Sequence, residues 1–186
     1  MKKAMLLAVA ILLMAGALSA QTLPPIGYIG VYADAGRASN TVCPAQYGQF
    51  QAWIWCLPNV MGLQAAEFAV SFPATTVTLA TVQNPAITVA LGTLAGGISV
   101  AFGEGSCQMN WAWTHNLTMM SLALPSVPGK IDIIKHPGTQ PPAYQFATCE
   151  PGYPIVPCIY LTPLYICQSG PVGVEETNWG AIKSLF

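Results

Sequence analysis

The sequence predicts an all-β fold, an antiparallel β-sandwich, and three observations support this prediction. Short segments alternate apolar and polar residues, which is the pattern of a strand with one buried face. The 16 prolines and 17 glycines recur along the chain and interrupt any long helical periodicity. Turn-forming clusters such as "FPATT", "QNPA" and "GEGS" separate the alternating segments. Many short strands at this spacing are typical of two packed sheets.

The alternating segments give the expected strands in chain order. These strands are 27–34, 47–56, 63–72, 75–82, 87–91, 97–102, 108–124, 129–136, 143–148 and 158–167. The segment 63–72 is the clearest, because Phe68 and Val70 would share a buried face and Glu67 and Ser71 the opposite one. No linker or internal repeat divides the strands, so we expect residues 21–168 to form one sandwich domain.

The first twenty residues resemble a secretory signal peptide. Lys2 and Lys3 supply a positive start, an uncharged apolar run follows, and small residues precede Gln21. The apolar run is shorter than the ~20 residues that span a bilayer, so no transmembrane span is expected after processing. A retained N-terminal anchor is the alternative. The pattern predicts export, with a bacterial type of leader and a secreted or cell-surface location.

The chain carries very little charge. Charged residues make up 7% of it, against about 25% in ordinary soluble domains. If Lys2 and Lys3 leave with the leader, four basic residues remain against seven acidic ones. This balance provides no basic surface for nucleic acid, so we expect no nucleic-acid partner.

The even number of cysteines predicts disulfides in an exported chain. All six follow the leader: Cys43, Cys56, Cys107, Cys149, Cys158 and Cys167. The sequence cannot choose among the possible pairings. The pairs that we expect are Cys43–Cys56, Cys107–Cys149 and Cys158–Cys167. The alternative is a metal site, but no Cys-x-x-Cys spacing occurs, so neither a metal nor another cofactor is expected.

Two pairs of tryptophans are the candidate ligand-binding residues. Trp111 and Trp113 alternate with small and polar residues in "CQMNWAWTHN", and they would share a core-facing side with His115. The same is expected of Trp53 and Trp55, which would share a face with Gln49 and Gln51 and be less cleanly buried because these companions are polar. Aromatic rings on a strand can form a platform for sugar rings. Packing within or beside the core is the alternative for both pairs.

No local motif for catalysis is found. The chain lacks Gly-x-Ser-x-Gly and His-Glu-x-x-His, and neither His115 nor His136 has a motif partner. In "YADAGRASN" we expect Asp34, Arg37 and Asn40 to shape a turn. An enzyme would need a site assembled from scattered residues, so a secreted hydrolase is the third hypothesis and no catalytic residue is assigned.

Three stretches in chain order resemble a cohesin module. They are "GLQAAEFAVSFPATTVTLATV", "LAGGISVAFGEG" and "VPGKIDIIKHP", and the resemblance covers residues 27–136. It implies an Ig-like or cohesin-like jelly roll, close in shape to some carbohydrate-binding modules. It also implies a non-enzymatic role in structure or protein–protein contact. A carbohydrate-binding module that uses the strand tryptophans is the alternative function.

The C-terminal segment resembles the Trp-Gly-x-Ile-Lys endings of many exported proteins of environmental bacteria. "VEETNWGAIKSLF" (174–186) has acidic residues near its start and apolar residues at helical spacing. We expect residues 169–186 to form a linker and a short tail. The tail would serve as a tether to the cell surface or pack on its own domain.

Overall fold

The computed structural model describes residues 24–124 and 126–167. The expected signal peptide and the expected C-terminal tail lie outside these residues. The described part contains twelve strands and no helix. The strands are β1 (Gly27–Tyr32), β2 (Thr41–Val42), β3 (Gln49–Leu57), β4 (Ala65–Ser71), β5 (Thr76–Gln83), β6 (Ile87–Thr93), β7 (Gly97–Phe102), β8 (Ala112–Ser121), β9 (Gly129–Ile134), β10 (Gln145–Ala147), β11 (Ile155–Tyr160) and β12 (Leu164–Ile166).

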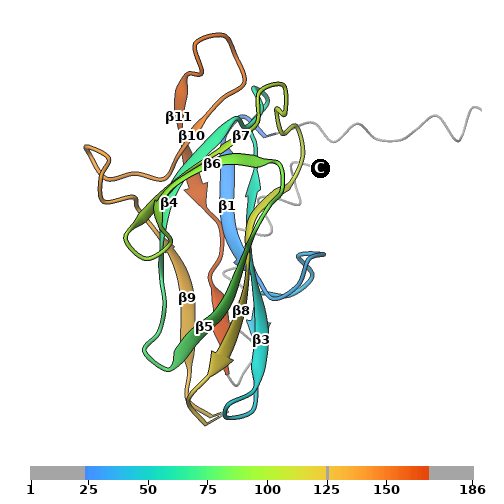
Figure 1. The fold of residues 1–186 in the computed structure, drawn as a ribbon, viewed down its shortest axis with the longest axis vertical. Helices are drawn as coiled ribbons and strands as arrows, with labels where there is room; N and C mark the ends of the chain where they lie inside the picture. Colours follow the sequence, from blue (N-terminus) through green and yellow to red (C-terminus); the bar gives the residue numbers. More distant parts are fainter. Residues whose placement is uncertain (1–23, 125, 168–186) are drawn as a thin grey trace, which may run out of the picture.

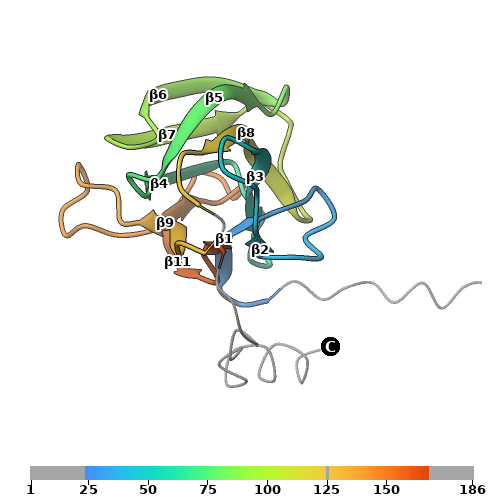
Figure 2. The same ribbon diagram turned by 90° about the horizontal axis from the view of Figure 1, so that it is seen from below.

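The strands form one hydrogen-bonded sheet that folds over into two layers (Figure 1). One layer contains β5, β8, β3 and β1, and the other contains β6, β7 and β4 with β9 and β10. β11 joins the layers on one side, because its start pairs with β10 and its end pairs with β1. On the opposite side β5 pairs with β8 and β6 with β7, and no other described strand pairs with their outer edges (Figure 2). The sandwich is therefore closed at β11 and open between β5 and β6.

This architecture confirms the predicted all-β sandwich and most of its strands. Each expected segment contains a strand, but 158–167 contains the end of β11 and all of β12, divided at Pro163. The two-residue β2 was missed. Two pairings, β1 with β11 and β2 with β12, are parallel. Pairings between such distant segments leave no turn signal in the sequence, so alternation alone could not predict them.

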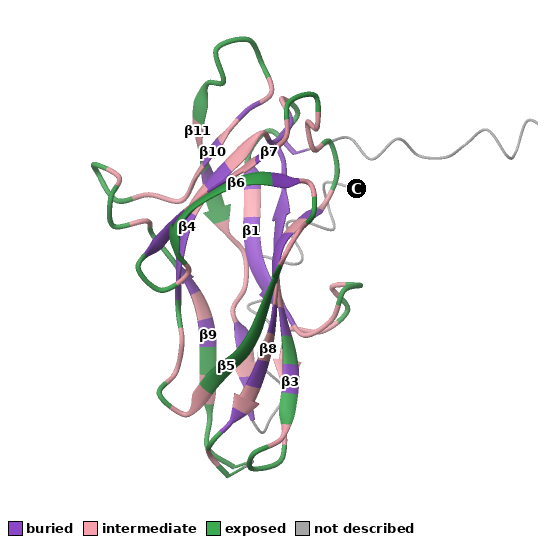
Figure 3. Cartoon of the chain, viewed as in Figure 1, coloured by how far each residue is buried: buried purple, intermediate pink, exposed green. Residues whose placement is uncertain are grey.

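The core lies between the layers and is built from alternate side chains. On β4, Ala66, Phe68 and Val70 are buried as predicted, and Ser71 is exposed. The largest fully buried side chains also come from β1, β3, β8, β9, β10 and β12: Phe146, Ile29, Ile54, Leu117, Met119, Ile131, Ile133 and Leu164. Figure 3 shows the contrast between the buried β1 and the exposed β5.

A β-bulge in β8 overturns the predicted face of the tryptophans. Ile54 of β3 lies opposite His115, but the next residue, Trp55, lies opposite Trp113, so Thr114 is the extra residue. One extra residue moves every side chain before it to the other face. His115 therefore points into the core as predicted, whereas Trp113 lies on the outer face. Thr114, expected to face water, is buried.

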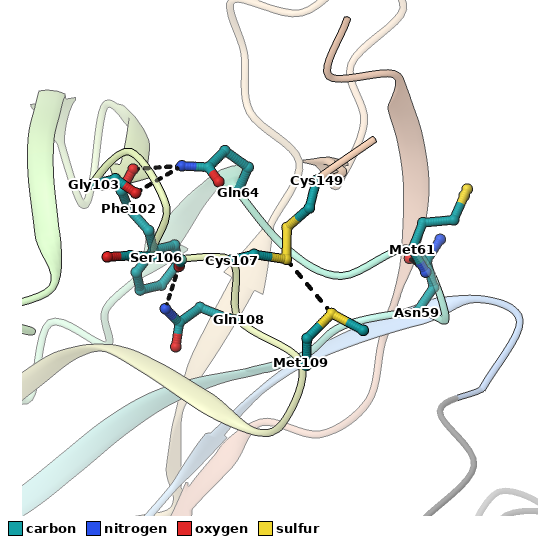
Figure 4. The surroundings of a disulfide bond; sticks show 10 residues. All are labelled: Asn59, Met61, Gln64, Phe102, Gly103, Ser106, Cys107, Gln108, Met109 and Cys149. Atoms are coloured by element: carbon teal, nitrogen blue, oxygen red, sulfur yellow. Dashed lines mark hydrogen bonds between the residues drawn. A yellow bond between two sulfur atoms is a disulfide. The ribbon is translucent and has the colours of Figure 1, made fainter. Parts of the chain in front are cut away.

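The structure contains the predicted Cys107–Cys149 disulfide, which joins the β7–β8 loop to the β10–β11 loop. Figure 4 shows it between these loops, with Met109 Sδ 3.5 Å from Cys107 Sγ. The pair closes a loop of sequence separation 42, which should contribute about 2–4 kcal/mol to the free energy of unfolding.

The other two expected pairings are wrong. Cys43 Sγ lies 2.7 Å from Cys167 Sγ, because β2 and β12 are neighbours in the sheet. Cys56 and Cys158 are buried and unpaired, on the two strands that flank β1. Burial, together with the nearby Cys158, raises the pKa of the Cys56 thiol. Cysteines that are close in sequence are thus separated by the strand order.

Gly62 tests how tightly the disulfide is packed. Its φ is +76°, and a Cβ added there would lie 2.5 Å from Cys107 Sγ. Gly105 has a similar φ of +74°, but a Cβ there would meet nothing within 4 Å. We expect Gly105→Ala to lower the free energy of unfolding by about 1 kcal/mol, from its backbone conformation. Gly62→Ala should lower it by roughly 2 kcal/mol more, because of overpacking.

Urea denaturation of both variants without reductant measures the difference. Equal losses of unfolding free energy in the two variants would show that the disulfide moves easily and that the space beside Gly62 is not tightly packed.

Candidate interaction surfaces

The four candidate tryptophans lie together on the outer face of β1, β3 and β8. The aromatic cluster consists of Tyr32, Trp53, Trp55, Trp111 and Trp113. Trp53 stacks on Trp55 at 6.5 Å between ring centroids and meets Trp113 edge-on at 5.3 Å. Trp111 meets Tyr32 edge-on at 6.1 Å. The structure therefore brings both tryptophan pairs together on the outer face, whereas alternation predicted that Trp111 and Trp113 face the core and that Trp53 and Trp55 do so less completely.

Arg37 occupies the open side of this cluster. Its Cζ lies 4.6 Å from the ring centroid of Trp55 and 4.8 Å from that of Trp111, which is cation–π geometry. The guanidinium group therefore occupies one face of the Trp55 ring and one face of the Trp111 ring. A sugar ring could stack there only by displacing Arg37, so the aromatic cluster is not an open platform in this conformation.

The turn that carries Arg37 has the chemistry that the sequence predicted. The Asp34 carboxylate accepts hydrogen bonds from the N–H groups of Ala38 (3.1 Å) and Ser39 (2.9 Å). Asn40 Nδ2 donates to Thr162 Oγ1 at 2.6 Å, which fastens the end of the loop to the segment before β12. These bonds fix the loop from which Arg37 reaches the aromatic cluster.

A second surface, which the sequence analysis missed, lies on the outer face of the other layer. We call it the apolar trough. It is a shallow depression of about 180 Å³ lined by Ala65, Glu67, Val89, Leu91, Ser99, Val100, Ala101, Gln145, Ala147 and Ile155. The lining comes from five strands, β6, β7, β4, β10 and β11.

Strand register explains the shape of the apolar trough. One cross-strand row runs from Val89 through three alanines, Ala101, Ala65 and Ala147, to Ile155. The alanines form a low floor between two larger side chains. The neighbouring row runs from Leu91 through polar residues. Leu91 and Ile155 are 65% and 66% exposed, so the rim of the trough is apolar and open to solvent.

The polar row of the trough is internally satisfied. Glu67 Oε1 accepts a hydrogen bond from Ser99 Oγ at 2.8 Å. Its Oε2 accepts from Gln145 Nε2 at 2.6 Å. Glu67 is the single charged residue among the described residues of the lining, and both of its oxygens retain lone pairs for a further donor.

His115 lies at the open side of the sandwich, in a cleft of about 340 Å³ between β5 and β6. The other residues that line the cleft are Phe72, Thr78, Thr81, Gly92, Thr93, Leu94 and Ile98. Among the described residues, the lining of this cleft contains no carboxylate and no thiol. His115 is buried, its Nδ1 has no hydrogen-bond partner among the described residues, and burial lowers its pKa to about 4.

The described ranges hold no group of three or more His, Cys, Asp or Glu residues arranged to bind a metal. None of their residues forms a helix long and apolar enough to cross a membrane.

No protein-family model matches the sequence, and no curated protein matches it either. Several solved structures share the fold. A cohesin module from a Clostridium perfringens family 33 glycoside hydrolase superposes with a TM-score of 0.53 at 6% identity, covering 76% of this chain and 93% of the module. The sixth cohesin of Acetivibrio cellulolyticus scaffoldin B, in complex with a dockerin, gives 0.51 at 11% identity, covering 74% and 96%. These likenesses confirm a cohesin-like β-sandwich fold.

The pKa of His115 predicts a pH-dependent stability. The unfolded chain takes up a proton on His115 below about pH 6.5, whereas the folded domain resists protonation down to about pH 4. This part of the stability is therefore complete above pH 6.5 and is lost as the pH falls toward 4. Between pH 7 and 4.5 we expect a loss of roughly 2–3 kcal/mol from this residue.

Urea denaturation at the two pH values, on the wild type and on His115→Gln, isolates the effect. The variant shares every carboxylate with the wild type, so the difference between their pH dependences belongs to His115. Parallel pH dependences would show that the histidine is protonated equally easily in both states.

Proposed function

We propose that this domain is an exported, non-enzymatic β-sandwich module that binds a protein through the apolar trough. The observation that carries the proposal is the exposed apolar rim over a floor of small residues. Val89, Leu91 and Ile155 are 47%, 65% and 66% exposed and border the same depression. Exposed apolar side chains that gather around a depression mark interaction sites more often than scattered ones do.

The shape of the trough favours an extended or helical protein segment. A row of three alanines provides a floor that a ridge of partner side chains can approach closely. Such grooves take apolar anchors from a partner, and most of the binding energy comes from a few of them.

Glu67 would set the polar requirement for the partner. Its carboxylate already accepts from Ser99 and Gln145, which holds it in place in the trough. No Lys, Arg or His is found in the part of the lining that the structure describes. A hydrogen-bond donor or a basic side chain on the partner would therefore meet a carboxylate that is held in place and has no ion-pair partner in the described lining. This contact would fix the orientation of the partner in the trough.

The fold supports a protein partner. The Acetivibrio cohesin of similar fold was solved in complex with a dockerin. At 11% identity the likeness covers fold only, so the partner of this chain is proposed as a protein of apolar and basic contact chemistry.

Export and surface attachment complete the proposal. The leader-like residues 1–20 and the Cys107–Cys149 disulfide both favour an oxidising compartment outside the cytoplasm. Residues 169–186 would tether the module to the cell surface. β12 ends at Ile166 and is the last described strand, so the proposed tether would follow the end of the sandwich.

Carbohydrate binding through the aromatic cluster is the second candidate, since five aromatic side chains gather on one face. It ranks below protein binding because Arg37 covers Trp55 and Trp111.

The apolar trough is tested by placing a charge on its rim. A photo-crosslinking residue at position 91 should capture a partner from the secreted and surface proteins of the source cell. With that purified partner, we expect Leu91→Asp and Ile155→Asp each to weaken binding by roughly 30-fold or more, about 2 kcal/mol, as for anchor residues at interfaces. Isothermal titration calorimetry measures the loss.

Val82→Asp is the matched control. Val82 is 55% exposed on β5, outside the trough, and this variant should bind within about twofold of the wild type. Equal binding by all variants would remove the trough from the proposal. A glycan array that binds the wild type but not Trp53→Ala or Trp55→Ala would instead support the carbohydrate-binding alternative.

A further inference from the structure

The sheet brings two cysteines together at the point where the described chain ends. β2 and β12 are parallel neighbours, with Thr41 opposite Tyr165 and Val42 opposite Ile166. One further step along this register places Cys43 opposite Cys167. The N–H of Cys167 donates to the carbonyl oxygen of Val42 at 2.7 Å, so the ladder continues to this last pair.

This register has the right spacing for a covalent bond. Neighbouring strands lie about 4.8 Å apart, and disulfide-bonded residues have Cα atoms roughly 4.4–6.8 Å apart. The side chains also converge, since Cys43 Sγ lies 2.7 Å from Cys167 Sγ. Backbone spacing and sulfur position therefore agree independently.

We propose that Cys43 and Cys167 form a second disulfide, which fastens β2 to β12 and closes nearly the whole domain into a covalent loop. The bond joins residues separated by 124 positions in the sequence. It differs from both pairings that sequence proximity favoured for these cysteines. It needs no movement of any strand, because the two backbones are already paired.

The bond forms by thiol–disulfide exchange with an oxidising disulfide, either a protein dithiol oxidant or a small-molecule disulfide. Cys43 is exposed, so its thiolate attacks the oxidant first, giving a mixed disulfide and releasing one thiolate. The Cys167 thiolate then attacks Cys43 Sγ and expels the second. Two thiols of the chain thereby lose two protons and two electrons, and the oxidant is reduced to two thiols.

Cys56 and Cys158 provide an internal comparison. Both are buried within the sandwich, and burial raises the pKa of each thiol. They lie on β3 and β11, with β1 between them. No bond joins their sulfur atoms, and the strands that carry them do not pair directly. We therefore expect these two residues to remain buried thiols.

Peptide mapping of the full chain, secreted by an oxidising host and alkylated before digestion, tests the assignment. The expected map links the Cys43 peptide to the Cys167 peptide and the Cys107 peptide to the Cys149 peptide. Cys56 and Cys158 should carry the alkylating group. Denatured protein should accordingly titrate with two thiols, since two of the three cysteine pairs are oxidised.

The double variant Cys43→Ala/Cys167→Ala gives the energetic readout. Without reductant its melting temperature should fall on the order of 10 °C below the wild type, because a loop this long loses much entropy when it is closed. Either single variant should fall as far as the double one. Alkylated Cys43 and Cys167, or a Cys43–Cys56 link, in the wild-type map would overturn the proposal even if the variants did not fold.

Discussion

A single steric rule governs this domain: side chains along a strand alternate between its two faces, and one inserted residue exchanges those faces. Three β-bulges, each with one inserted residue, exchange the faces of strands in this domain. Thr114 in β8 sends Trp113 outward, Leu79 is the extra residue of β5, and Thr88 in β6 separates the buried Ile87 from the exposed Val89. The first insertion assembles the aromatic cluster, and the third supplies the rim of the apolar trough. Both surfaces exist because the ladder is interrupted.

The same rule explains how far the sequence could be interpreted. Alternation located almost every strand and the buried side of β4, because each buried position of a strand is occupied by an apolar residue. The position of a bulge cannot be predicted from this alternation. "ITVAL" places Ile87, Val89 and Leu91 on one face by strict alternation, whereas the structure separates the first from the other two. The hydrogen bonds of the Asp34 carboxylate within its turn were predictable, because the residues that donate them lie within five positions in the sequence.

Non-local features were beyond sequence reasoning. The lining of the apolar trough comes from five strands between Ala65 and Ile155, so no short motif contains it. One signal was present: residues 68–103 contain no charged residue, although two of their strands lie at edges of the sheet. Exposed edges normally carry charges that discourage association. Their absence here is a signal in the sequence that fits the contact surface proposed above. Cysteine pairing was hidden for the same reason, because it depends on strand order.

The parallel pairing of β12 has a mechanical consequence. Anything that pulls on the polypeptide beyond residue 167 transmits its force to a strand of three residues, held by β9 on one edge and β2 on the other. If hydrogen bonds alone held so short a strand, they could break one after another as the strand separates from the sheet. A disulfide between Cys167 and Cys43 would transmit the tension to Cys43 directly. The sandwich would then resist the applied force as one unit.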